Sequence, residues 1–317
     1  MALSTFAELN EKMTEHFQKG EFQQALDLVE REGENFPADR PMVNYWNMCA
    51  AARVDNRARV YQIAEGFHKE GFWFGEMMWR MTPSFKPLQG DAEFERIVAE
   101  SLKLQAHDSP AENSVLLKLS PKNISKENPL LIALHGNQNT AARTLPFWKP
   151  AVDEGFVLAV PQSTQAVFKD AFMWDDLDVS FAQVKNCLES LKKEADFDTN
   201  HVILAGHSMG GLVAIQMALT DELPVHGLIA NGPALPFEDS PDELEKAIAS
   251  AKERGLRAYF IMGDKDVDIE QDAIRVFVEK MRSAGIPCEL EIVPGATHDY
   301  SPNYDSALVH ALKFIKS

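Results

Sequence analysis

The chain has 317 residues, of which 45% are hydrophobic and 25% are charged, so the composition excludes a largely disordered protein. Its length suits two domains rather than one. Acidic residues number 48 against 31 Lys and Arg, a formal net charge of −17, so we expect no general nucleic-acid or anionic-membrane surface.

The three cysteines, Cys49, Cys187 and Cys288, lie far apart and show neither a CxxC nor a paired Cys/His spacing. The sequence therefore supports neither a disulfide framework nor a structural zinc site. The first residues lack the basic segment and apolar run of a signal peptide, and no stretch approaches the ~18 apolar residues of a membrane-spanning helix. We expect a cytoplasmic protein.

Residues 1–108 carry apolar side chains at helical spacing and predict a small all-α domain. A first helix is marked by Phe6, Leu9, Met13 and Phe17, and a second, after Gly20, by Phe22, Ala25, Leu26 and Val29. This helix–Gly–helix layout, closed by Pro37, resembles a tetratricopeptide repeat, and a degenerate second unit would cover residues 41–71. An ordinary helical bundle is the alternative.

Large rings gather in the segment 71–75, Gly-Phe-Trp-Phe-Gly, and at Trp79. These rings would pack against the second domain or form a wall facing a substrate. The polar stretch 106–113 contains Pro110 and predicts a linker. We therefore place the boundary between residues 108 and 109, with the second domain covering 109–317.

The second domain alternates short apolar runs with longer amphipathic segments. The predicted strands are 114–119, 129–134, 156–160, 201–205, 227–231, 257–262 and 288–293. The predicted helices are 179–194, 210–219, 241–254, 269–284 and 306–315. Apolar strands separated by helices predict an α/β fold, with a mostly parallel sheet that has helices on both faces.

The strongest local motif is Gly-His-Ser-Met-Gly-Gly at 206–211, which follows a predicted strand and opens a predicted helix. It matches the G-x-S-x-G nucleophile elbow in the required context. Ser208 would sit in a sharp turn that projects its hydroxyl above the sheet, and the flanking glycines would let strand and helix pass closely. A serine that merely caps the helix is the alternative.

A serine nucleophile needs a base and a group that orients the base, which follow it in the order acid then His. Asp264 and Asp266 both follow the strand 257–262, and we choose Asp266 as the acid because Asp264 would bond its own turn. His298 follows the next strand and is the predicted base. His310 falls within a predicted helix, where a solvated or packed role is expected.

An oxyanion needs rigid donors beside the nucleophile. The amide of Met209 is the first candidate, and the loop after the strand 129–134 should supply the second. Gly136 would turn the next amide inward, so Asn137 comes before Gln138 as a candidate. His135 and His207 are predicted to be structural.

These four ordered motifs resemble an α/β-hydrolase of the carboxylesterase, phospholipase and dienelactone-hydrolase-like group over residues 114–317. Ser208 stands where dienelactone hydrolases have a cysteine. The resemblance implies that the loop bearing Trp174 overhangs the site. Gln138 and Trp174 are therefore the candidate substrate-binding residues, and for Trp174 packing within its loop is the alternative.

We therefore expect a serine esterase that cleaves a small-molecule carboxylic ester through Ser208, Asp266 and His298, with no cofactor and no metal, since HExxH, GxxxxGK and GxGxxG motifs are absent. A thioesterase or peptidase would use the same triad. A protein of another class, in which residues 1–108 bind a partner or form a homodimer and the hydrolase part is a scaffold, is the alternative. The helical domain would wall the pocket or mediate dimerisation.

Overall fold

The computed structural model describes residues 3–108, 116–193, 197–237 and 239–316. The chain forms two compact units. One comprises Met1–Ser109 together with Ala166–Lys169, and the other comprises Pro110–Gln165 and Asp170–Ser317. A single division between residues 108 and 109 therefore leaves out residues 166–169, which belong to the helical unit.

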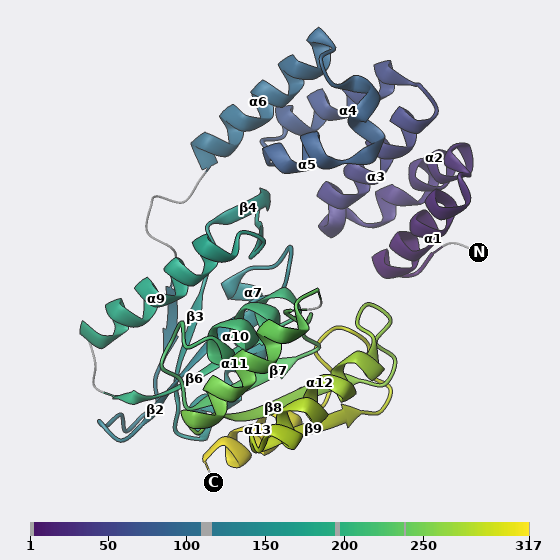
Figure 1. The fold of residues 1–317 in the computed structure, drawn as a ribbon. Coiled ribbons are helices and arrows are strands. Elements are labelled where there is room, and N and C mark those ends of the chain that lie inside the picture. The colour runs from purple at the N-terminus through teal and green to yellow at the C-terminus, as the bar shows by residue number, and fades with distance from the viewer. Residues whose placement is uncertain (1–2, 109–115, 194–196, 238, 317) are drawn as a thin grey trace. The chain divides into compact units, whose positions relative to one another are not determined.

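The helical unit is built from consecutive helices: α1 (Phe6–Lys19), α2 (Phe22–Glu32), α3 (Arg40–Arg53), α4 (Arg57–Lys69), α5 (Glu76–Met81) and α6 (Ala92–Asp108), with 3-10 turns η1 (Gly33–Asn35), η2 (Pro37–Asp39) and η3 (Pro83–Leu88) (Figure 1). Gly20 ends α1 in a left-handed conformation, with φ of 72°, which favours glycine. The predicted first two helices are confirmed, whereas the tetratricopeptide likeness stays a prediction. Of the predicted linker 106–113, residues 106–108 belong to α6 and the rest lie outside the described residues.

The ring-rich segment forms the core of the helical unit. Phe74 stacks on Phe67, with ring centroids 4.7 Å apart, and meets Trp79 edge-on. Its backbone amide and carbonyl are both bonded to the hydroxyl of Ser101. Phe168, from the segment 166–169, packs edge-on against Phe74 with centroids 5.8 Å apart. The segment that the sequence assigned to the second domain therefore completes the core of the first.

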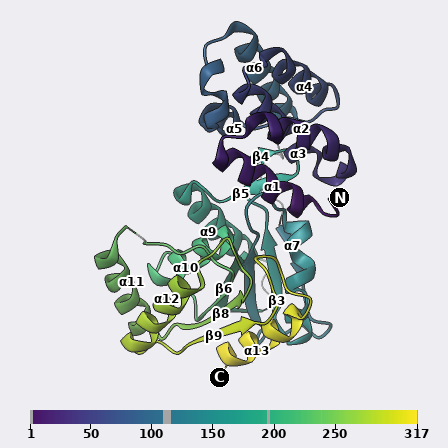
Figure 2. The ribbon, with the colours of Figure 1, turned by 90° about the vertical axis from the view of Figure 1, so that its right-hand side faces the viewer.

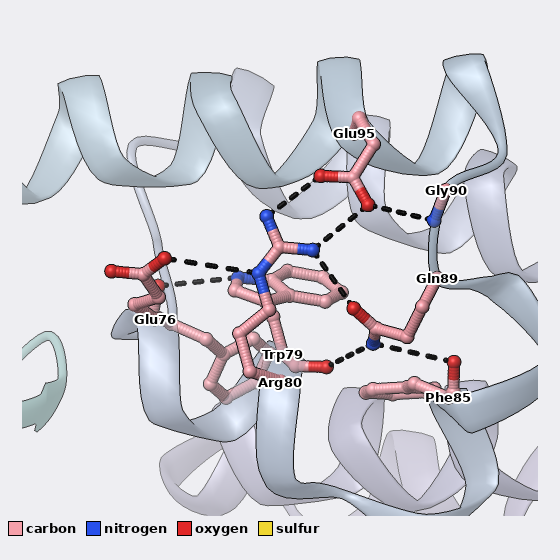
Figure 3. Close-up of polar contacts among 8 residues, drawn as sticks. Glu76, Trp79, Arg80, Phe85, Gln89, Gly90 and Glu95 are labelled. Carbon is pink, nitrogen blue, oxygen red and sulfur yellow. Dashed lines mark hydrogen bonds and ion pairs between the residues drawn. The ribbon is translucent and has the colours of Figure 1, made fainter.

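A polar network joins α5, η3 and α6. The guanidinium of Arg80 donates to both carboxylate oxygens of Glu95, at 2.8 and 2.7 Å, and to the side chain of Gln89 (Figure 3). Glu95 also accepts from the amide of Gly90, and Gln89 donates to the carbonyl of Trp79. The bond from Arg80 and the Gly90 amide together lower the pKa of Glu95 to about 2.

The second unit contains a seven-stranded sheet in the order β1-β3-β2-β6-β7-β8-β9. Its strands are β1 (Leu116–Leu119), β2 (Pro129–Leu134), β3 (Val157–Pro161), β6 (Asp198–His207), β7 (Gly227–Asn231), β8 (Arg257–Gly263) and β9 (Cys288–Val293). Among the described residues of this sheet, β1 pairs antiparallel with β3, and the other pairings are parallel. The predicted fold class is thus confirmed.

Helices cover both faces of this sheet, as Figure 2 shows. The first face packs against α9 (Leu177–Lys193), α10 (Met209–Leu219), α11 (Pro241–Glu253) and α12 (Gln271–Ala284). The second packs against α7 (Ala141–Trp148), α8 (Pro150–Asp153) and α13 (Tyr304–Lys316). We call these the α11/α12 face and the α13 face. Because the central strands are parallel, the loops that leave β2, β6, β7, β8 and β9 meet at one edge of the sheet.

The sequence predicted the principal strands and helices of this unit but missed α7 and α8. It also missed the two-stranded sheet of β4 (Gln165–Phe168) and β5 (Ala171–Met173), of which residues 166–168 belong to the helical unit. Pro146 lies inside α7 and Pro150 begins α8, so prolines interrupt the helical pattern of this region. Within the described ranges, no helix has the length and apolar character needed to cross a membrane.

Candidate active site

Ser208 occupies the sharp turn between β6 and α10. Its backbone has φ of 53° and ψ of −120°, a conformation that non-glycine residues seldom adopt. A Cβ on Gly206 would lie 2.3 Å from the carbonyl oxygen of Gly210, and a Cβ on Gly210 would lie 2.3 Å from the carbonyl oxygen of His135. Neither position has room for a side chain, so both must be glycine, as the motif predicts.

The structure brings Ser208, His298 and Asp266 into one hydrogen-bonded chain. The Oγ of Ser208 lies 2.9 Å from Nε2 of His298, and Nδ1 of the same ring lies 2.9 Å from a carboxylate oxygen of Asp266. The Asp266 side chain is fully buried, while that of His298 is 20% exposed. The carboxylate can only accept at Nδ1, so that nitrogen carries the proton and Nε2 is free to accept from the serine hydroxyl.

Asp266 is held by more than the imidazole. Its second carboxylate oxygen accepts from the amides of Asp268 and Ile269, each at 3.0 Å. Gly232, after β7, lies against the pair: a Cβ there would be 3.4 Å from both the Asp266 carboxylate and His298 Nδ1. Gly232 could not be identified from the sequence, because its close approach to Asp266 and His298 involves two later loops.

Asp264, the rival acid, points elsewhere. Its carboxylate accepts from the amide of Gly295 at 2.6 Å, so it joins the loop after β8 to the loop that carries His298. We predicted that Asp264 would bond its own turn; the partner is instead a residue of the next loop. Asp264 therefore holds the start of the loop that carries His298. Of the two aspartates, Asp266 is the one whose carboxylate hydrogen-bonds to the His298 ring.

The loop after β2 lies against the nucleophile. A Cβ on Gly136 would lie 2.9 Å from the His207 ring and 3.5 Å from the Cβ of Ser208. The left-handed residue of this loop is Gln138, with φ of 55°, whereas Gly136 provides the close approach; the inward turn of the Asn137 amide stays a prediction. Reciprocal backbone bonds between Asn139 and Phe172 hold the end of the loop.

The oxyanion donors stay a prediction, for which the structure gives the surroundings of each candidate amide. Met209 is the first residue of α10, so its amide has no acceptor within the helix. Asn137 and Gln138 are exposed in the loop beside Ser208. The structure thus leaves both loop residues open as the second donor.

His135 is a buried structural group. Its Nε2 accepts from the amide of Ser163 at 3.1 Å, so the proton must be on Nδ1, which donates to the Gly136 carbonyl at 2.7 Å. Burial lowers the pKa of His135 to about 4, which keeps the ring neutral. Trp174 is fully buried, and its indole N–H donates to the His135 carbonyl. This burial fits the alternative that Trp174 packs within its loop, against the His135 ring, and a substrate contact by Trp174 stays a prediction.

His207 also has a structural environment. Its Nδ1 contacts the side-chain amide of Asn231 at 3.0 Å, and its ring lies 4.7 Å, centroid to centroid, from Tyr300. Burial, followed by the nearby His298, lowers its pKa to about 4. His310 is exposed on α13 and pairs with Glu291. Neither ring contacts Ser208 among the hydrogen bonds of the described residues.

One group of potential metal-binding side chains occurs in the described part of the chain: Asp266, Asp268 and His298, whose donor atoms lie within 4.8 Å of one another. Asp266 and His298 are the residues that already form the chain to Ser208. The triad contacts account for this cluster, and we assign no metal to it.

Comparison with known proteins identifies the family. The sequence profile of the Dienelactone hydrolase family matches residues 153–311, which include Ser208, Asp266 and His298. The chain belongs to this family. Membership in the Dienelactone hydrolase family makes the chain a hydrolase of the ester-cleaving class, on an α/β-hydrolase fold.

The chain is also similar to a bifunctional acetylxylan esterase/xylanase of Neocallimastix patriciarum, with 32% identity over 97 residues. The match covers 29% of this chain and only 14% of the relative, so it concerns a small part of that protein.

Solved structures resemble the chain more broadly. An uncharacterized protein from Bacillus cereus is 25% identical, covers 99% of this chain and 100% of its own, and has a TM-score of 0.56. The likeness therefore includes the helical residues. Esterase PE8 is 17% identical over 64% of this chain and 99% of its own, with a TM-score of 0.52. A propionate-bound Est2 esterase from Thermogutta terrifontis is 17% identical over 63% of this chain and 88% of its own, with a TM-score of 0.50. These two structures match the hydrolase fold alone.

Proposed function

We propose that this protein is a serine esterase that hydrolyses carboxylic esters through an acyl-enzyme on Ser208. The observation that carries the proposal is the unbroken chain of 2.9 Å contacts from Ser208 Oγ through His298 to Asp266. In this arrangement Nε2 of His298 can accept the serine proton. The Asp266 carboxylate faces the imidazole ring, which becomes positively charged when it takes that proton.

In the first half-reaction, Ser208 Oγ bonds to the ester carbonyl carbon while its proton passes to His298 Nε2. The carbonyl electrons move to the oxygen, which accepts from the amides of Met209 and Asn137, with Gln138 as the alternative to Asn137. The electron pair of the oxyanion then re-forms the carbonyl as the bond to the leaving alcohol oxygen breaks, and His298 donates its proton to that oxygen.

In the second half-reaction, His298 takes a proton from water as the water oxygen attacks the acyl carbon. The bond to Ser208 Oγ breaks, the serine regains its proton, and the acid leaves. Asp266 keeps the ring oriented in both steps, and its own bonds to the amides of Asp268 and Ile269 keep the carboxylate in place.

The nature of the substrate follows from two observations. The nucleophile is a serine hydroxyl, which suits carboxylic esters once a base activates it. The named relatives include an acetylxylan esterase and a propionate-bound esterase, both names of small acids. We therefore propose esters of small carboxylic acids, and we do not transfer the lactone substrate of the family name, because Ser208 replaces its cysteine.

Hydrolysis of p-nitrophenyl butyrate tests this function. Ser208→Ala removes the nucleophile and should lower kcat at least ~10⁴-fold, because without the hydroxyl only binding and the oxyanion donors remain. The matched control is Ser283→Ala, an exposed serine on α12, which should keep the activity. Near-ultraviolet circular dichroism should be alike for all three proteins. Full activity in folded Ser208→Ala would refute the assignment.

A further inference from the structure

A mainly apolar cavity lies at the edge of the sheet where the triad forms. It has a volume of about 360 Å³ and lies between the N-terminal parts of α11 and α12, which pack side by side (Figures 1 and 2). Its wall is mainly apolar and is formed by Leu235, Pro236, Phe237, Leu244, Val276 and Phe277. Nothing in the catalytic steps above uses these residues.

The two chain segments that line this cavity come directly from the triad. Ala234 donates its amide to the carbonyl oxygen of Ser208 at 3.3 Å, and the next residue, Leu235, lines the cavity. On the other side, Ile269 donates its amide to the Asp266 carboxylate, and the next residue, Glu270, lines the cavity. On both sides, the first lining residue follows in sequence a residue that hydrogen-bonds to Ser208 or Asp266, so the backbone that supports the triad runs directly into the wall of the cavity.

Stereochemistry directs one part of an ester toward it. The tetrahedral carbon carries four groups: Ser208 Oγ, the oxyanion, the leaving oxygen and the acyl chain. The oxyanion faces the amides of Met209 and the loop after β2. The leaving oxygen must face His298 Nε2, which protonates it. The loop from His298 continues through Tyr300 to the α13 face. The acyl chain is left to point toward the opposite, α11/α12 face.

We propose that this cavity is the acyl pocket, and that the substrate carries an uncharged aliphatic acyl group that fills it. The inference rests on the proposed esterase function. The volume is at the small end of the range for small-molecule sites, so a medium-length chain fits and a long fatty chain does not. The charged lining residues are Glu270, Asp272 and Lys280, which is an acidic balance that disfavours an anionic acyl group.

The test measures kcat/KM for p-nitrophenyl acetate, butyrate, hexanoate and palmitate with the full-length protein. Each methylene buried in the cavity should raise kcat/KM by up to about fourfold, with the rise ending before palmitate. Val276 is 58% exposed on α12, so a larger side chain can be placed there without disturbing the core. Val276→Trp should fill the cavity and lower the hexanoate-to-acetate ratio of kcat/KM at least about tenfold.

The matched control is Arg275→Trp, which adds the same ring at the neighbouring exposed position outside the cavity lining and should keep the wild-type ratio. If Val276→Trp fails to fold, Ala273→Leu narrows the same cavity with a smaller change. If kcat/KM does not rise from p-nitrophenyl acetate to hexanoate, or if the hexanoate-to-acetate ratio is unchanged in the folded cavity variants, the acyl pocket is refuted and the esterase function is not. Absence of all ester hydrolysis would overturn both.

Discussion

Two buried histidines predict a specific loss of stability in mild acid. Burial holds the pKa of both His135 and His207 at about 4 in the folded protein, against an ordinary value of 6.5. Between these values the unfolded chain binds protons that the folded protein does not, so the free energy of unfolding falls as the pH falls. The contribution of these two neutral histidines to the free energy of unfolding is fully present above pH 6.5 and is lost as the pH falls toward 4.

The magnitude follows from the two pKa values. At pH 5 an imidazole of the unfolded chain is almost fully protonated, while the folded His135 and His207 are mostly neutral. Each group then lowers the free energy of unfolding by about 2 kcal/mol relative to pH 7, or about 4 kcal/mol together. Burial also lowers the pKa of His68 and His201, so their contributions have the same sign.

Urea unfolding at pH 7, 6 and 5 measures this loss, and ¹⁵N NMR of the imidazole rings assigns it. We expect His135 to show the Nδ1–H tautomer, set by its bonds to Gly136 and Ser163, and to stay neutral at pH 5. A stability that is flat from pH 7 to 5, or a His135 ring that titrates near 6.5, would refute the reasoning.

Three substitutions test the supports of the site and of the helical unit. Gly210→Ala places a methyl group 2.3 Å from the His135 carbonyl, so α10 must shift and kcat/KM should fall about 100-fold; activity near wild type would contradict the steric argument. Asp264→Ala removes the acceptor for the Gly295 amide and should lower kcat about tenfold, whereas Asp264→Asn keeps an acceptor and should lower kcat less. Equal losses of kcat in the two variants would contradict a role for the bond between Asp264 and Gly295. Phe168→Ala empties a site in the core of the helical unit and should cost about 3–5 kcal/mol in urea unfolding; a loss below about 1 kcal/mol would show that residues 166–169 are dispensable there.

The nucleophile elbow was predictable because its glycine spacing lies within six residues. A Cβ on Gly206 would meet the backbone of Gly210 and Gly211 in the same turn, which is a local requirement, whereas Gly210 is needed because the end of β2 passes close to it, at the carbonyl oxygens of Leu134 and His135. The order of Ser208, Asp266 and His298 was predictable for a related reason. Parallel strands bring their carboxyl ends to one edge, so residues just after those strands must meet.

Other features depend on contacts between distant segments and left no local pattern. The choice between Asp264 and Asp266 depends on which carboxylate faces the ring, and Asp264 faces Gly295 instead. The family resemblance implies that the loop of Trp174 overhangs the site, but the Trp174 ring is fully buried and its indole N–H donates to the His135 carbonyl. Residues 166–169 are too few and too ordinary to reveal that they complete another unit.

The central claim is that His298 activates Ser208 as a nucleophile, and fluorophosphonate labelling tests it most directly. Peptide mapping by mass spectrometry should locate the adduct on Ser208, with none in Ser208→Ala. In folded His298→Gln, which keeps the serine and removes its base, the labelling rate should fall at least about 100-fold. An adduct on another residue, or an equal labelling rate in His298→Gln, would contradict the account.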